Sequence, residues 1–413
     1  MNIRSVTLGT SLSDPLDHSD FGRIEAFQEA ARARFEAAGL PVQTVRLATQ
    51  PFPEILRDAR AAAPFAQALE ATCQAHGVDY CSIGTVDATR PDADLSYVDA
   101  IPDVIRQTEM AFASVLVAAP GSGINLAAID RAAQAIADIA RTTPEGFGNL
   151  RLAVLANCDA GTPFFPAAFH RGPQAAFSIA TDAADLAVTA FEGVATLAEA
   201  RVALREAVEQ AAVTMTRVAA TLENTFGIRF GGIDFSPAPF PETARSIGRA
   251  IEALGVDAFG SSGTLFAVAF ITQVLREARF PHCGFSGVML PVLEDTTLAQ
   301  RSRDRLFTLD SLLLYSAVCG TGLDTIPLPG DTSADELAAI LLDVATLAVV
   351  ADKPLTARLM PIPGKAAGDV TAFDFPYFAN AQILDVRGRG GRRIFSQNTF
   401  VDFPFKLPYT FGN

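Results

Sequence analysis

The chain of 413 residues has no tryptophan, four histidines and five cysteines. The cysteines are scattered and form no CxxC pair, so neither a disulfide framework nor a zinc knuckle is expected. These thiols, which we expect to be reduced, are Cys73, Cys81, Cys158, Cys283 and Cys319. With so few histidines, candidates for proton transfer near neutral pH are scarce.

Basic residues are also scarce. Lys and Arg total 32 against 46 Asp and Glu, which gives a formal net charge of −14. Nucleic acids and anionic membranes require basic patches, so no nucleic-acid or membrane partner is expected. The one dense basic cluster, Arg387 to Arg393, is short, and we interpret it as a solvated loop in preference to an anion site.

Long apolar runs are absent. The longest, such as Leu337–Val350, are shorter than the roughly 20 residues that span a bilayer, so no transmembrane helix is expected. The first nine residues read as a strand entering a glycine turn and lack the features of a signal peptide. We therefore expect a cytoplasmic protein. No GxSxG elbow, P-loop lysine or full dinucleotide fingerprint occurs.

What the sequence does contain is 49% hydrophobic residues in alternating strand and helix patterns. Such alternation predicts an α/β fold of mainly parallel strands sheathed by helices. The expected strands are Ser5–Gly9, Val42–Ala48, Tyr80–Ile83, Ala113–Ala118, Leu150–Ala156, Ala176–Ala180, Gly231–Phe235, Ala258–Gly260, Met289–Val292 and Ala357–Pro361. The main expected helices are Phe21–Ala38, Ile55–His76, Val98–Glu109, Ile124–Arg141, Leu197–Phe226, Glu242–Leu254, Thr264–Ala278, Leu306–Cys319 and Ala334–Ala351.

No linker divides the chain, so a single large domain over residues 1–413 is predicted. Ser114–Ala140 and Val256–Ala278 both read as strand, glycine turn and helix, which indicates two pseudo-repeated halves, about 1–226 and 227–369. The tail, 370–413, is rich in Phe, Pro, Gly and Arg and predicts irregular β structure folding back on the body. The apolar helices favour a homo-oligomer.

Two glycine-rich turns are candidate anion sites, because each connects an apolar strand to a helix N-terminus. One is Pro120–Asn125, which contributes Asn125. The other is Gly260–Thr264, which contributes Ser261, Ser262, Gly263 and Thr264. The alternative is a plain tight turn with a capping side chain.

The irregular segment 157–172 follows a strand end and is a candidate site loop. It offers the amide of Asn157 for substrate binding and His170 as the best candidate for proton transfer. A structural histidine bonded to the backbone is an equally good interpretation of His170.

Acidic residues follow three apolar segments. Asp234 and Ser236 leave one strand on the same face, as a candidate catalytic carboxylate and a substrate-binding hydroxyl, although both could cap the next helix. Glu294, Asp295 and Asp324 would suit Mg²⁺ or Ca²⁺ better than zinc. Cys319, beside a glycine-rich bend, is a candidate nucleophile, with an inert core thiol as the alternative.

Several runs together carry a family resemblance. They are Gly260-Ser-Ser-Gly-Thr264, Pro291-Val-Leu-Glu-Asp295, Cys319-Gly-Thr-Gly-Leu-Asp-Thr-Ile-Pro-Leu-Pro-Gly-Asp331, Arg358-Leu-Met-Pro-Ile-Pro-Gly-Lys365-Ala-Ala-Gly-Asp369, Ser122-Gly-Ile-Asn125, Leu155-Ala-Asn157, Pro163-Phe-Phe, Ala168-Phe-His170 and Asp234-Phe-Ser-Pro-Ala-Pro239. With them the chain resembles, over nearly its whole length, the uncharacterised domain-of-unknown-function 711 family. Lys365, within the last C-terminal run, joins the candidate anion-binding residues.

The resemblance implies a fold similar to the glycyl radical enzymes of the pyruvate formate-lyase type, with two half-barrels of parallel strands around a central site. The chain departs from the family pattern at Ser261-Ser262, where a Thr-His pair is common, and from Val370 onward. Asp385–Gly391 also lacks the tyrosine of a glycyl radical segment, so no radical chemistry is expected.

Two functions remain open. The first is an enzyme without a glycyl radical that acts on a small polar anionic metabolite in a central barrel pocket, with a divalent metal as a further option. The second is a non-catalytic protein that binds or senses such a metabolite on the same fold. Convergence of the polar groups in one cavity would separate the enzyme from the binding protein.

Overall fold

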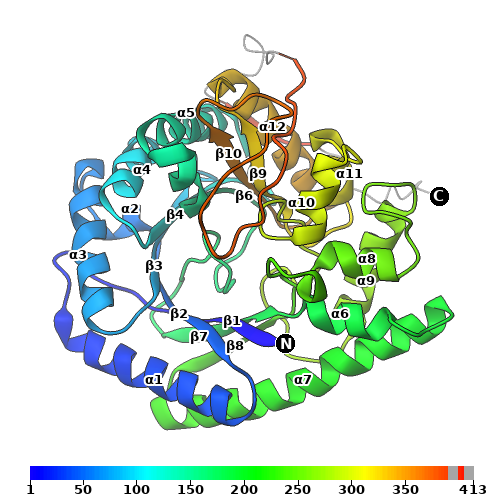
Figure 1. Cartoon of the computed structure of the whole chain (residues 1–413). Helices are drawn as coiled ribbons and strands as arrows, with labels where there is room; N and C mark the ends of the chain where they lie inside the picture. The colour runs from blue at the N-terminus through cyan, green and yellow to red at the C-terminus, as the bar shows by residue number, and fades with distance from the viewer. Residues whose placement is uncertain (389–398, 404–413) are drawn as a thin grey trace, which may run out of the picture.

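The computed structural model describes residues 1–388 and 399–403. Its strands lie around the middle of the molecule, with helices on the outside (Figure 1). The strands are β1 Asn2–Gly9, β2 Val42–Ala48, β3 Tyr80–Asp87, β4 Ala111–Ala119, β5 Gly123–Asn125, β6 Leu152–Ala156, β7 Ala176–Asp182, β8 Arg229–Asp234, β9 Gly322–Pro329, β10 Leu355–Ile362 and β11 Phe400–Val401. The mixed α/β class with a mainly parallel sheet is therefore confirmed.

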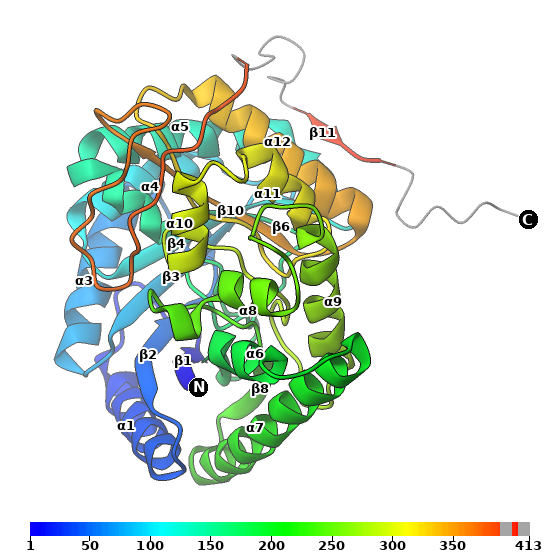
Figure 2. The same ribbon diagram turned by 45° about the vertical axis from the view of Figure 1, so that its right-hand side comes forward.

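The α-helices are α1 Phe21–Ala37, α2 Phe52–Ile55, α3 Ala62–Ala75, α4 Ser96–Gln107, α5 Leu126–Thr142, α6 Ala184–Phe191, α7 Leu197–Phe226, α8 Ile247–Ala253, α9 Thr264–Glu277, α10 Thr296–Arg303, α11 Leu309–Ser316 and α12 Ala334–Ala351. Helix α7 begins at a capping box between Thr196 and Glu199, and Gly227, which follows its last residue, adopts a left-handed conformation. It packs beside α1 and α9 on the outside of the molecule (Figure 2).

The main sheet has the strand order β8-β7-β1-β2-β3-β4-β6-β10-β9. Strands β1, β2, β3, β4 and β6 run parallel to one another. Strands β7 and β8 on one side, and β10 and β9 on the other, run antiparallel to this central group and parallel within each pair. The sheet thus reverses strand direction twice.

The two edge strands contact the same segment of chain. Its first part pairs with β8 through a parallel bridge between Ile233 and His282, and its last part pairs with β9 through a bridge between Pro291 and Asp324. Backbone hydrogen bonds of 3.1 and 3.2 Å, from Cys283 N to Ile233 O and from Val292 N to Asp324 O, support both contacts. Residues 281–292 therefore connect the sheet edges.

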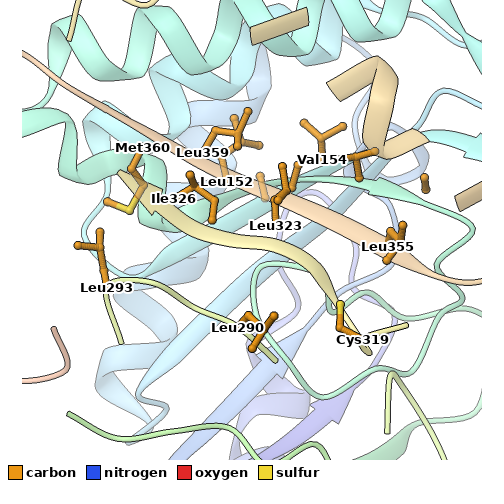
Figure 3. Packing of buried hydrophobic residues seen from close by; sticks show 14 of the residues in the cluster. Leu152, Val154, Leu290, Leu293, Cys319, Leu323, Ile326, Leu355, Leu359 and Met360 are labelled. Carbon is orange, nitrogen blue, oxygen red and sulfur yellow. The ribbon is translucent and has the colours of Figure 1, made fainter. Parts of the chain in front are cut away.

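The core lies between the sheet and the helices and contains side chains from both ends of the chain, from Ile3 of β1 to Met360 of β10. Figure 3 shows part of it, where Leu152 and Val154 of β6 lie close to Leu323 and Leu355. Among the residues that the structure describes, none of the helices is long and apolar enough to cross a membrane.

The described part of the tail after β10 folds back over the sheet (Figure 1). Val370 pairs with Gln382 in an antiparallel bridge, and Phe373, Phe378 and Ile383 are buried in the core. This part of the tail therefore packs against the core.

Three predicted elements were wrong. Ala258–Gly260 is a turn, because Gly260 has a φ of 101°, so the strand of the second pseudo-repeat is missing. Met289–Val292 forms only an isolated bridge, and helix Ile55–His76 is broken into α2, a short 3-10 turn and α3. Strand β9, which contains Asp324, was not predicted, since its two prolines argue against a strand interior.

Candidate functional site

A cavity of about 100 Å³ lies inside the curved sheet. Its walls come from the amino-terminal ends of β1, β2, β3, β4 and β6, together with β9 and β10. The residues that line it include Arg4, Gln43, Arg46, Tyr80, Phe112, Leu150, Phe165, Pro239, Glu294, Thr321, Asp324, Arg358, Phe375 and Tyr377. The sequence directed attention to the carboxyl ends of the strands, where open sheets place ligands.

Strand alternation directs charged side chains into this cavity. On β2, Val45 and Leu47 face the core, so Arg46 between them faces the cavity together with Thr44. On β10, Ala357 and Leu359 face the core and Arg358 faces the cavity in the same way. One arginine in each of these two strands, on the face opposite the core, is thus the local origin of the charged cavity wall.

Register shifts place two further charges. The pairing of β1 with β7 slips between Ile3 and Ser5, at Arg4. The pairing of β10 with β9 slips opposite Arg358, where Asp324 and Thr325 occupy the extra position and Thr325 has a φ of 44°. Such bulges redirect a side chain, and here they bring Arg4 and Asp324 to the cavity wall.

Four of the charged residues form one network. Arg358 donates from Nη2 to Glu294 Oε1 at 2.7 Å and from Nε to Asp324 Oδ1 at 2.7 Å. Arg4 pairs with the other oxygen of Glu294 and donates to Pro239 O at 3.1 Å. Although burial alone would raise the pKa of Glu294, Arg358 and Arg4 hold that pKa below its ordinary value.

Arg46 stands apart from this network. The residue is 9% exposed, and the one hydrogen bond of its side chain to the described residues runs from Nε to Thr44 Oγ1 at 2.9 Å. The guanidinium lies 5.6 Å from the Tyr80 ring centre and 5.2 Å from that of Phe165. Burial, and then the neighbouring Arg4, lower the pKa of Arg46 to about 9, so it stays charged at neutral pH. Within the described residues no carboxylate pairs with it.

Two more polar atoms of the wall have no partner among the described residues. They are Gln43 Oε1 and Thr321 Oγ1, both of them buried. Buried polar groups are normally hydrogen-bonded, so these two atoms and the Arg46 guanidinium make the cavity the candidate site.

The segment 157–172 enters the interior of the sheet and forms the floor of the cavity. Ser5 and Thr7 of β1 donate to the carbonyl of Pro163, at 3.2 and 2.8 Å, and Ser82 of β3 donates to the carbonyl of Ala168 at 2.9 Å. These buried hydroxyls therefore hold the loop, which contributes Phe165 to the cavity wall.

The other side is covered by segments that follow β8 and β10. Phe240 and Tyr377 make an edge contact with ring centres 5.8 Å apart, and Phe375 lies against Tyr377 at 5.2 Å. The tail therefore completes the wall of the site.

Most of the candidate residues predicted from the sequence lie elsewhere. Asp234 is buried and accepts four hydrogen bonds, from Ser236 N and Oγ, Phe285 N and Ser286 N. Burial raises the pKa of Asp234. With Ser236 bonded to it at 2.6 Å, this pair holds the segment after β8 against residues 285–286 and does not reach the cavity.

Asp295 has a similar structural role. It accepts hydrogen bonds from the backbone of Ile247 and Gly248 at the start of α8 and of Thr297 and Leu298 at the start of α10. Because Glu294 and Asp324 are both paired with Arg358, the three acids predicted to bind Mg²⁺ or Ca²⁺ do not form a ligand set. Among residues 1–388 and 399–403, no group of three His, Cys, Asp or Glu could hold a metal ion.

His170 and Asn157 line two pockets at the carboxyl ends of the strands, with volumes of about 220 and 490 Å³. His170 Nε2 bonds to Gly172 O at 2.8 Å, and burial lowers its pKa, which suits a neutral structural histidine. Asn157 donates to Ala348 O at 2.8 Å.

Cys319 is a core residue. Figure 3 shows it among buried apolar side chains near Leu290, and its sulfur accepts a hydrogen bond from Gly322 N at 3.2 Å. Lys353 donates to the carbonyl of Cys319 and not to its sulfur. Cys319 does not line the central cavity.

The glycine-rich turns are also structural. Asn125 caps α5 by accepting from Ala128 N at 3.1 Å, and Thr264 bonds to Gly260 N and Ser261 O within its own turn. Ser262 and Gly263 are exposed, and neither these residues nor Lys365 line the central cavity. Gly388 is exposed, whereas Gly390 and Gly391 lie outside the described residues.

The sequence interpretation found Glu294 and Asp324 but missed Arg4, Arg46 and Arg358. The signal was present: Arg46 and Arg358 interrupt strands whose other residues are almost all buried. A buried strand tolerates an arginine only where it is paired or functional.

Comparison with known proteins gives a consistent relationship. The model of the family described as "Uncharacterised ACR (DUF711)" matches residues 1–380. A UPF0210 protein of Pyrobaculum arsenaticum is 33% identical over 400 residues, which cover 89% of this chain and 87% of that protein. UPF0210 proteins of Methanopyrus kandleri and of Neisseria meningitidis serogroup C are 31% and 28% identical, over 89% and 90% of this chain and 88% of each relative.

Proposed function

The chain belongs to the uncharacterised DUF711 family, and from this premise and the chemistry of the central cavity we propose that the protein binds a small anionic metabolite through Arg46. The family supplies no activity, so the proposal depends on the cavity. Its ligand would carry a carboxylate or a phosphate group, which a guanidinium binds with two parallel hydrogen bonds.

The observation that carries the proposal is the missing partner of Arg46. A buried charge without a counterion costs several kcal/mol in real proteins, so buried arginines are usually paired. Here Arg4 and Arg358 pair with the nearby carboxylates, whereas the Nη groups of Arg46, which lines the cavity, make no hydrogen bond or ion pair with the described residues. An anionic ligand would supply the missing charge.

The cavity supports binding more directly than catalysis. In the described part of the chain its lining contains no histidine, cysteine or lysine, and its two carboxylates are both held by arginines. A catalytic role, without a glycyl radical, therefore stays the second candidate. Glu294 is the group that favours it, because a ligand that competes for Arg4 or Arg358 would release this carboxylate inside the cavity.

A closed barrel of two half-barrels, as in the pyruvate formate-lyase type of fold, is likewise a proposal. It is supported by the two reversals of strand direction and by residues 281–292, which contact both edge strands. A homo-oligomer is supported by exposed apolar side chains on the neighbouring helices α9 and α11, namely Leu265, Phe266 and Leu314.

The proposal predicts that Arg46→Gln weakens anion binding at least about tenfold, because charge-assisted hydrogen bonds are lost. Isothermal titration calorimetry with acetate, benzoate and inorganic phosphate would measure it. Arg90→Gln is the matched control, since Arg90 is exposed and pairs with Asp92 on the surface. The proposal would be wrong if Arg46→Gln bound every one of these anions as tightly as the wild type does.

A further inference from the structure

A second hollow adjoins the central cavity. It has a volume of about 560 Å³ and is lined by the ends of α4 and α5, the segment 143–151 and the tail residues 373–375. The cavity and this hollow share four lining residues, Tyr80, Phe112, Leu150 and Phe375. We call the hollow the aromatic groove, because Phe147 and Phe373 line it in addition to the shared rings.

The charges of the two spaces differ. The cavity holds three arginines and two carboxylates, Glu294 and Asp324, which gives a net charge of +1. The outer rim of the aromatic groove presents Glu109, Glu145 and Asp374, all of them exposed. A ligand with a single negative charge would neutralise the cavity, and a second negative charge at the groove end would meet acids.

The cationic side chains of the groove are already occupied. Arg151 donates to Thr108 Oγ1 at 3.0 Å, to Ala111 O at 3.1 Å and to Ile105 O at 2.6 Å. Arg106 pairs with Asp103 at 2.7 Å. The groove therefore offers apolar contact more than anion recognition, and the anion site is confined to the cavity.

The surroundings of Arg46 are aromatic on the side that faces the groove residues Tyr80 and Phe112. Its guanidinium lies against Tyr80 and Phe165, and Tyr80 makes an edge contact with Phe112 at 5.5 Å between ring centres. Aromatic side chains thus follow one another from Arg46 to the groove, where Phe147 contacts Phe375 with ring centres 5.1 Å apart. Aromatic rings in such a path favour other rings in tilted or edge geometry.

We propose that the ligand is an amphipathic monocarboxylate, whose carboxylate pairs with Arg46 and whose apolar, ring-sized body extends past Tyr80 and Phe112 into the aromatic groove. This inference rests on the proposed function, because it identifies the class of the anion bound at Arg46. A phosphate ester, with nearly two charges at neutral pH, would leave an uncompensated negative charge in the cavity.

The test is an affinity series on the wild-type protein, with acetate, benzoate, phenylacetate, 3-phenylpropionate and inorganic phosphate as probes. Buried methylene groups strengthen binding about fourfold each, so affinity should rise from acetate to 3-phenylpropionate and exceed that for phosphate. Phenylacetamide, which lacks the charge, should bind at least about tenfold more weakly than phenylacetate.

A groove variant sharpens the test. Phe147→Ala should reduce the gain in affinity from acetate to 3-phenylpropionate, because Phe147 lines the groove and not the cavity. Val213→Ala is the control, since Val213 is 53% exposed on α7 and lines neither space. Should Phe147→Ala fail to fold, the wild-type series still decides the question.

The outcomes separate the two proposals. Equal affinities for all carboxylates, or preference for phosphate, would overturn the amphipathic monocarboxylate while binding that depends on Arg46 still supported the proposed function. Absence of any anion binding that depends on Arg46 would overturn both. A rising series that Phe147→Ala leaves unchanged would overturn the assignment of the groove.

Discussion

Asp295 and Arg46 are both buried charged side chains, but their surroundings differ. Asp295 accepts five hydrogen bonds, from Ser246 Oγ and from four backbone amides at the starts of α8 and α10. Arg46 donates one, to Thr44. The fold therefore satisfies the carboxylate completely and leaves the guanidinium open to the cavity. Burial is common to both residues and does not separate them. The hydrogen bonds do: they identify Asp295 as structural and Arg46 as the candidate functional residue.

The largest effect is expected at the satisfied charge. Asp295→Ala would leave buried amides at two helix starts without acceptors, so it should lower the free energy of unfolding by roughly 3–5 kcal/mol. Urea denaturation would measure it. Asp295→Asn keeps one acceptor oxygen and should lose less. If Asp295→Ala were as stable as the wild type, the structural role would be wrong.

The opposite effect on the free energy of unfolding is expected at Arg46, which has no carboxylate partner among the described residues. Without ligand, Arg46→Met should change the free energy of unfolding by less than about 1 kcal/mol or increase it, because it removes an uncompensated buried charge. Arg358→Met is the matched control. It breaks the pairs with Glu294 and Asp324 and should cost roughly 3–5 kcal/mol. If both variants lost the same free energy of unfolding, Arg46 would not differ from the paired Arg358, and the argument for the site would fail.

The smallest effect is expected at His170, a buried group that is satisfied in its neutral form. Burial lowers the pKa of His170 below its ordinary value of 6.5, so the native state binds fewer protons than the unfolded chain between the lowered pKa and pH 6.5. The stability that His170 contributes is thus present above pH 6.5 and is lost as the pH falls through the lowered pKa.

Denaturation of the wild type and of His170→Gln at pH 8 and pH 5 would measure this. The difference in free energy of unfolding between the two proteins should shift in favour of the variant at pH 5. A difference that does not change with pH, or one that favours the wild type more at pH 5, would show that His170 is not held neutral by the fold.

The pattern of strands and helices was largely accessible from the sequence. The bounds of α7, α12 and β2 agree with the prediction residue for residue, because apolar periodicity and end signals coincide there, as at Gly227 after α7. Strand β9 was missed because its two prolines argue against a strand, and they are tolerated here because β9 lies at the edge of the sheet.

The candidate site was much less accessible. Glu294 and Asp324 were named as metal ligands, yet both are paired with Arg358, which comes from a different strand. Ser261 and Ser262 do lie in a turn before a helix, but neither residue lines the cavity. A local sequence pattern shows which interactions a side chain can make. The residues with which it actually pairs come from distant parts of the chain.

The sequence by itself determined the α/β alternation, the large apolar core and the acidic surface, because these follow from local periodicity and composition. Only the tertiary structure decided which charges are satisfied. Arg4, Arg46 and Arg358 lie on three strands far apart in the sequence, and curvature of the sheet brings them to one cavity. Which of them lacks a carboxylate depends on Glu294 and Asp324, whose positions are set by a loop and a strand bulge.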